Sequence, residues 1–147
     1  MTRALAAALV AAVALAATGC AGDDATRVTL TDSGCSYDGP ESVGAGTVSL
    51  DIENETDRHG VFELLRLAPE SSFEALQAHI ETEQGRIAAG QLPLGPPDFA
   101  TLVLQLEVDA GETGTLSSAL TEATYAVTCG TFDPPTALHL AEPFEVS

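Results

Sequence analysis

Short runs of alternating apolar and polar residues, each bounded by turn residues, recur along most of this chain of 147 residues. In the run 48–53, Val48, Leu50 and Ile52 alternate with polar residues, so one face of an extended segment is apolar. Residues 61–67 are apolar almost throughout, which predicts a central strand covered on both faces. Strands this short and this frequent are typical of an all-β sandwich. The expected strands, seven or eight in number because 37–43 is only weakly extended, are 28–31, 37–43, 48–53, 61–67, 102–108, 115–120, 125–129 and 144–146.

One segment interrupts this pattern with apolar residues at helical spacing. Ser71 and Glu74, three residues apart, have the pattern of a capping box and predict a helix start. We expect one amphipathic helix over 72–88, packed on the sandwich by its apolar face and ended by Gly90 and the prolines that follow. The apolar positions of this helix are Phe73, Leu76, Ile80 and Ile87.

Residues 1–19 predict an export signal. A positive start at Arg3 precedes an apolar run of about fifteen residues, which is shorter than the roughly 20 residues of a membrane-spanning helix. The run ends in small residues followed by Cys20, an ending that resembles a bacterial lipobox. That resemblance implies that Cys20 becomes the first residue of the mature chain and is acylated on sulfur by a fatty acid such as palmitate. The alternative is an ordinary secretory signal with an incidental cysteine. The expected organisation is a signal peptide over 1–19, a tether over 20–26 and one domain over 27–147.

The charge of the chain restricts its partners. It has 22 acidic residues against five arginines and no lysine, for a formal net charge of −17. Removal of residues 1–19 leaves 128 residues, in which 22 acidic residues face four arginines, a formal charge of −18. Such a chain lacks the cation cluster that would displace the counterions of nucleic acid or adhere to anionic lipid. We therefore expect no nucleic-acid partner, and a membrane contact only through the lipid on Cys20.

Two cysteines remain once Cys20 is assigned to the lipid. An even number of cysteines in an oxidising compartment predicts a disulfide between Cys35 and Cys129. That bond would close a loop of about 95 residues, which stabilises a fold by about 4–5 kcal/mol in the loop-entropy model. The alternative keeps Cys129 as a free thiolate that ligates metal. These two alternatives exclude each other.

Four blocks of the sequence occur in the order found in cupredoxins: VTLTDSGC at 28–35, GTVSLDIEN at 46–54, VFELLRL at 61–67 and DAGETGTLSSALTEATYAVTCG at 109–130. The chain is most similar to the cupredoxin-like domain of periplasmic iron-uptake lipoproteins, in which a similar cysteine follows the first strand and a second follows a Tyr-x-x-x-Cys-Gly segment. The resemblance covers about 28–67 and 101–147, so the helix would be an insertion. It implies a Greek-key β-sandwich and a binding or accessory role in metal uptake.

The same resemblance implies copper binding as an alternative function. By position, His59, Cys129 and His139 match the two histidines and the thiolate of a blue-copper centre. The usual axial methionine has no counterpart, because the single methionine, Met1, belongs to the signal peptide. The stretch from Cys129 to His139 is also longer than the usual ligand loop.

Two further patterns each have a structural interpretation and a metal-binding alternative. The acidic residues at 51, 53, 55 and 57 predict a solvated face, with a weak hard-cation site as the alternative. His79 and Glu83 lie one helical turn apart and predict a polar pair beside the apolar stripe, with a metal pair as the alternative.

Common catalytic motifs are missing from the sequence. It contains no Gly-x-Ser-x-Gly elbow, no phosphate-binding glycine loop and no HExxH. We therefore expect a non-enzymatic, lipid-anchored extracytoplasmic protein without a cofactor, whose disulfide-stapled domain binds a protein partner that the sequence does not name.

Overall fold

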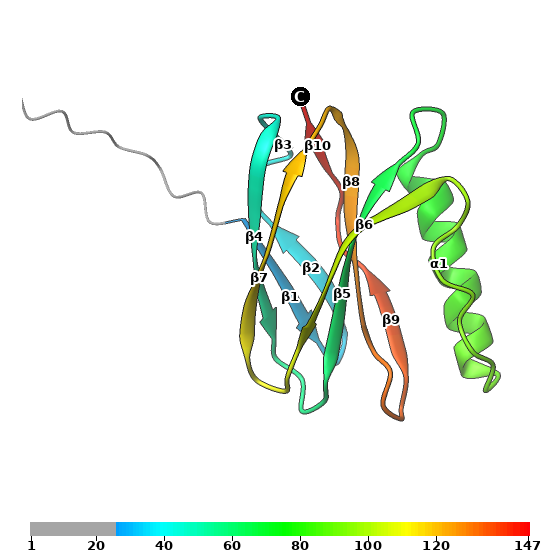
Figure 1. The fold of residues 1–147 in the computed structure, drawn as a ribbon. Helices are drawn as coiled ribbons and strands as arrows, with labels where there is room; N and C mark the ends of the chain where they lie inside the picture. Colours follow the sequence, from blue (N-terminus) through cyan, green and yellow to red (C-terminus); the bar gives the residue numbers. More distant parts are fainter. Residues whose placement is uncertain (1–25) are drawn as a thin grey trace, which may run out of the picture.

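The computed structural model describes residues 26–147, so the expected signal peptide, Cys20 and most of the tether lie outside the described residues. The described chain forms two β-sheets that face each other, with one helix on the outside (Figure 1). In spatial order, the first sheet consists of β2 (Gly34–Asp38), β1 (Arg27–Thr31), β4 (Gly46–Asn54) and β7 (Thr113–Leu120). The second consists of β3 (Ser42–Val43), β10 (Phe144–Val146), β8 (Ala123–Thr131), β5 (Gly60–Leu67) and β6 (Ala100–Val108), with β9 (Ala137–Leu140) also paired to β8.

The two sheets form the expected β-sandwich with one helix. Two pairs are parallel, β1 with β4 and β3 with β10, and every other described pair is antiparallel. The described residues form ten strands, more than the seven or eight expected. The weakly extended region 37–43 divides into β2 and β3, which lie in different sheets, and 137–140 adds β9.

The main core fills the space between the two sheets. Val28 and Leu30 of β1, Ile52 of β4, and Phe62 and Val127 of the second sheet are each at most 1% exposed. Since burial of such side chains contributes roughly 1.5–3 kcal/mol each, this layer supplies most of the hydrophobic stabilisation.

A second cluster lies between the outer face of the second sheet and α1 (Phe73–Ala88) (Figure 1). Leu76 and Ile80 of the helix meet Leu65 and Leu67 of β5 there. The helix therefore packs on the sandwich, as its apolar stripe predicts. Strand β5 contributes side chains to both clusters, so it is covered on both faces, as its sequence predicts.

The helix begins one residue later than the capping box predicts. The N-cap is Ser72, whose hydroxyl accepts a hydrogen bond from Ala75 N at 3.2 Å. Ser71 instead donates its hydroxyl to the carbonyl of Ala68 in the preceding turn. The prediction that Ser71 caps the helix is therefore wrong. Glu74 keeps a role in the first turn. Its carboxylate accepts hydrogen bonds from its own backbone N–H and from the side chain of Ser72. Both bonds lower the pKa of Glu74, and the backbone bond is the larger cause.

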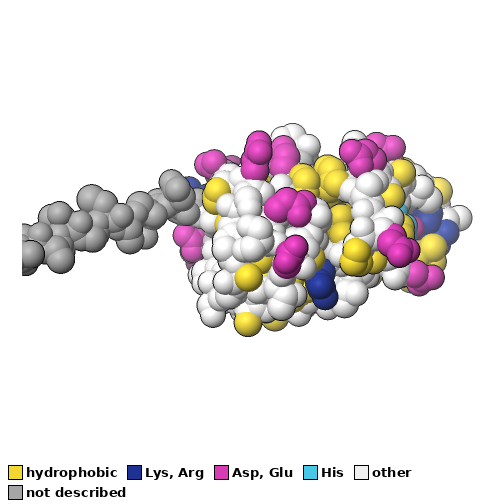
Figure 2. All heavy atoms as spheres, turned by 90° about the horizontal axis from the view of Figure 1, so that it is seen from above, with side chains coloured by type: hydrophobic (Ala, Val, Ile, Leu, Met, Phe, Trp, Pro, Cys, Tyr) yellow, Lys and Arg dark blue, Asp and Glu magenta, His cyan; other side chains and the backbone are white. Residues whose placement is uncertain are grey.

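Acidic side chains are spread over the face of the domain that Figure 2 shows. Within residues 26–147, no helix is both long enough and apolar enough to cross a membrane.

Candidate functional site

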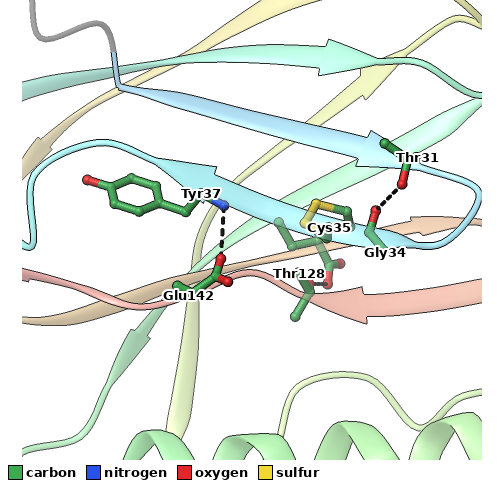
Figure 3. Close-up of a disulfide and its surroundings, with 8 residues drawn as sticks. Thr31, Gly34, Cys35, Tyr37, Thr128 and Glu142 are labelled. Atoms are coloured by element: carbon green, nitrogen blue, oxygen red, sulfur yellow. Dashed lines mark hydrogen bonds between the residues drawn. A yellow bond between two sulfur atoms is a disulfide. The ribbon is translucent and has the colours of Figure 1, made fainter.

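A disulfide between Cys35 of β2 and Cys129 of β8 joins the two sheets, which confirms the predicted pairing (Figure 3). The two Cα atoms lie 5.9 Å apart, a separation usual for a disulfide. Cys129 is fully buried in the main core, whereas Cys35 is half-buried at its edge. The sulfur that a copper centre would need is therefore already bonded.

The segment that follows β9 is fixed to β2 beside the disulfide. Tyr37 donates its backbone N–H to the carboxylate of Glu142 at 3.1 Å (Figure 3). The ring of Tyr37 stacks on Phe144, with centroids 5.2 Å apart, and Phe144 stacks in turn on Tyr125. These contacts tie the edge strand that carries Cys35 to the second sheet, so the disulfide has a second, non-covalent support.

His139 lies directly opposite Cys129 in the ladder between β9 and β8. Directly opposed residues of antiparallel strands share a face, so both belong to the face turned toward the first sheet. Leu138 and Leu140 alternate with His139 and pack against the helix cluster. Burial lowers the pKa of His139, because the protonated ring loses solvation there. The neutral ring is thus favoured.

His59, which directly precedes β5, is held by two carboxylates at the end of β6. Its Nδ1 lies 3.0 Å from Asp109 Oδ1 and its Nε2 lies 3.3 Å from Glu107 Oε2, so both ring nitrogens have carboxylate partners. The hydrogen bond with Asp109 is the largest cause that raises the pKa of His59, and Glu107 adds to it. This arrangement favours the imidazolium ion, which cannot ligate metal.

The three residues that the resemblance assigns to copper do not assemble into a centre. Cys129 and His139 are neighbours, but His59 is bonded to carboxylates at the end of β6 and Cys129 has no free sulfur. Among the described residues, no group of three or more histidine, cysteine, aspartate or glutamate side chains could hold a metal ion. The donor set His59, Cys129 and His139, as residues 26–147 arrange it, therefore does not fit a blue-copper site.

The His79–Glu83 pair also serves a structural purpose. His79 Nε2 donates to the carbonyl of Gly95 at 2.9 Å, and the carboxylate of Glu83 accepts the backbone N–H of Leu94. Both side chains thereby fix the α1–β6 loop, residues 89–99. Glu83 is only 1% exposed, whereas its spacing predicted a position beside the apolar stripe. The covering loop, which has no helical or strand periodicity, buries it.

A small cavity lies where this loop covers the sheet. It has a volume of about 70 Å³ and is bounded by the outer face of β5 and β8, by α1 and by the loop. Its charged lining residues are Glu63 and Glu83. Sequence reasoning missed Glu63 as a candidate, because a single glutamate within an apolar strand was the only signal available.

Asn54 is a further residue whose position the sequence did not indicate. It is 1% exposed, and its Nδ2 donates to the carbonyls of Arg58, Val108 and Asp109. Its Oδ1 accepts hydrogen bonds from the backbone and the hydroxyl of Thr56. Asn54 therefore joins the β4–β5 turn to the end of β6.

Two carboxylates of the acidic row 51, 53, 55 and 57 have arginine partners: Glu53 lies 3.6 Å from Arg27, and Asp57 lies 3.6 Å from Arg58. Asp51, Glu55 and Asp57 are exposed to solvent.

Neither a protein-family model nor a curated protein matches the chain. Among solved structures, it is similar to the reduced auracyanin of the photosynthetic bacterium Roseiflexus castenholzii, with 17% identity, a TM-score of 0.41 and coverage of 80% of this chain and 95% of that one. It is similar to auracyanin A, a "blue" copper protein of Chloroflexus aurantiacus, with 16% identity, a TM-score of 0.45 and coverage of 82% and 96%. An azurin of Methylomonas sp. strain J gives 12% identity, a TM-score of 0.39 and coverage of 83% and 96%.

Proposed function

We propose that the chain is an extracytoplasmic lipoprotein, anchored to the cell membrane through Cys20, whose cupredoxin-like domain is a non-enzymatic binding or accessory module. The observation that carries this proposal is the Cys35–Cys129 disulfide, which occupies the sulfur that copper chemistry would need. Disulfides of this kind persist in oxidising compartments, which agrees with the export signal in the sequence.

Charge supports a binding role of a particular kind. Acidic residues outnumber arginines by 22 to four in the expected mature chain, so a partner with a basic surface would be attracted over distance. Such steering would weaken with added salt as the Debye length shortens. Metal uptake is the process that the resemblance to iron-uptake lipoproteins suggests for this module.

A free-thiol titration under denaturing conditions tests the proposal. The fragment 21–147, made in an oxidising compartment, should contain no free thiol, because both of its cysteines are in the bond. Two free thiols would contradict the binding module and release Cys129 as a ligand beside His139. A copper titration of the same sample decides between the functions, since a copper–thiolate bond absorbs strongly in the visible range and a disulfide-closed domain stays colourless.

The membrane anchor has a separate test. Fragment 21–147, exported behind an ordinary secretory signal, lacks the acylated sulfur, so it should appear in the soluble exported fraction while the full chain stays in the membrane fraction. A fragment that remained in the membrane fraction would contradict the lipid anchor.

A further inference from the structure

The cavity beneath the α1–β6 loop has apolar walls and a polar floor. Leu65 of β5, Ile80 of α1 and Leu138 of β9 form its inner walls, and prolines of the loop close it from above. Phe132, which is 47% exposed, stands at its edge and leaves a way in from solvent. A volume of about 70 Å³ accommodates a chain of a few heavy atoms, since one water occupies about 30 Å³ in the liquid.

The polar floor consists of hydrogen-bond acceptors. Glu63 is half-buried, and its carboxylate accepts a hydrogen bond from the buried hydroxyl of Thr128 at 3.2 Å. Within residues 26–147, Glu63 has no arginine or histidine partner. Its negative charge therefore faces the cavity without a counterion from the protein.

The second carboxylate, that of Glu83, is more deeply buried, and one of its two oxygens lacks a hydrogen bond. One oxygen of Glu83 accepts the N–H of Leu94, but Oε1 is buried and accepts no hydrogen bond from the described residues. The nearest cation is Arg86, whose Nε lies 3.6 Å from Oε1 and also lacks a hydrogen-bond partner. Arg86 compensates the charge of Glu83 without donating a hydrogen bond to Oε1, so an N–H donor brought by a ligand would be favoured at this oxygen.

We propose that this cavity binds a primary alkylammonium group, with the short apolar chain against Leu65 and Ile80 and the ammonium between Glu63 and Glu83. The three N–H donors of an ammonium match the acceptors of the floor, and although Arg86 already pairs with Glu83 from outside the cavity lining, no arginine pairs with Glu63 among the described residues. This ligand class rests on the proposed binding function and makes it specific. A free alkylamine and the lysine side chain of a partner protein share this chemistry.

The loop is held in place before any ligand arrives. His79 bonds to Gly95, Glu83 to Leu94, and Arg86 donates to the carbonyl of Leu92 at 3.1 Å. A binding site whose walls are already fixed loses less entropy when a ligand enters it.

Saturation-transfer NMR with n-propylammonium, on the full lipoprotein in non-ionic detergent, tests the site. We expect saturable transfer from the protein to the propyl protons, beyond that of protein-free micelles, and clearly weaker transfer to n-propanol of the same chain length. Equal transfer to propanol, or no saturable transfer, would overturn the ligand class.

Two variants that remove the same charge locate the site. Glu63→Gln keeps the shape of the cavity and should weaken propylammonium binding about tenfold or more, as loss of a charge-assisted hydrogen bond does. Glu81→Gln, an exposed acid of α1 outside the cavity, should leave the affinity unchanged. Equal losses in both variants would assign the binding to the general negative charge and overturn the site.

A second ligand separates the two sources of the ammonium. Nα-acetyl-lysine methylamide should bind more tightly than propylammonium if a partner protein supplies a lysine, and less tightly if the cavity takes free amines. The thiol titration keeps this proposal separate from the proposed function. Closed cysteines without amine binding would overturn only the ligand class, and free thiols would overturn the binding module whatever the amine does.

Discussion

Cys129 and His139 face each other across the β8–β9 ladder, yet the sulfur of Cys129 is bonded to Cys35 on the opposite sheet. Two of the three positions that the cupredoxin resemblance assigns to copper, Cys129 and His139, are therefore neighbours in space. What separates this domain from a copper site is the use of the thiol and the position of His59, which is bonded to two carboxylates elsewhere.

The disulfide should contribute strongly to stability. It links residues 94 apart in the sequence, so its loss enlarges the conformational freedom of the unfolded chain. We expect the double replacement Cys35→Ala/Cys129→Ala to lower the free energy of unfolding by about 2–4 kcal/mol. Urea denaturation of both proteins measures this difference. Wild type unfolded in the presence of a reductant is the matched control and should resemble the variant. An unchanged midpoint in the variant would contradict the prediction.

The helix cap distinguishes two adjacent serines. Ser72→Ala removes the hydroxyl that accepts the N–H of Ala75 and should lower the free energy of unfolding by about 1 kcal/mol. Ser71→Ala removes only an exposed bond to Ala68 and should cost less. Thermal denaturation of the two variants side by side compares them. A larger loss for Ser71→Ala would restore the cap to the position that the sequence pattern predicts.

Most strands were predictable because one face of each is buried. The alternation at Val48, Leu50 and Ile52 and the apolar run of β5 both arise from packing against a neighbouring layer, and packing leaves a periodic trace in the sequence. The division of 37–43 into β2 and β3 left no such trace, because both strands are short and lie at sheet edges.

The residues of the cavity could not be found in the same way. Glu83 is buried by a loop without regular structure, and Glu63 gains its meaning from Thr128 on another strand. These are contacts between segments far apart in the chain, which local patterns do not encode. The disulfide was predictable for a different reason, since counting cysteines in an exported chain requires no knowledge of geometry.

Asn54 should be among the most sensitive polar positions. It is buried and bonds to three carbonyl groups and to Thr56, so Asn54→Ala leaves several buried polar groups without partners. We expect a loss of about 2–4 kcal/mol in the free energy of unfolding. Ser49→Ala, which removes one exposed bond to Ser117, is the control and should change stability by less than about 0.5 kcal/mol. Equal effects of the two replacements in urea denaturation would show that the Asn54 network is not a structural unit.

The pKa values of His59 and His139, the two histidines that the resemblance assigns to copper, should depart from the ordinary histidine value in opposite directions. Asp109 and Glu107 raise the pKa of His59, whereas burial lowers the pKa of His139. Asp109→Asn should lower the pKa of His59 and leave His139 unchanged, and Glu107→Gln should lower it less, because the bond to Asp109 is the larger cause. NMR titration of the ring protons in the wild type and in both variants measures the pKa values of His59 and His139.

The same shift fixes the sign of a pH effect on stability. Because the folded pKa of His59 exceeds the unfolded value, its ion pairs stabilise the protein fully below the ordinary pKa of about 6.5 and lose this effect as the pH rises through the folded pKa. The stability difference between wild type and Asp109→Asn should therefore shrink as the pH is raised above neutral. If His59 titrated at its ordinary pKa in both proteins, its nitrogens would not be held by these carboxylates, and the main geometric objection to His59 as a metal ligand would disappear.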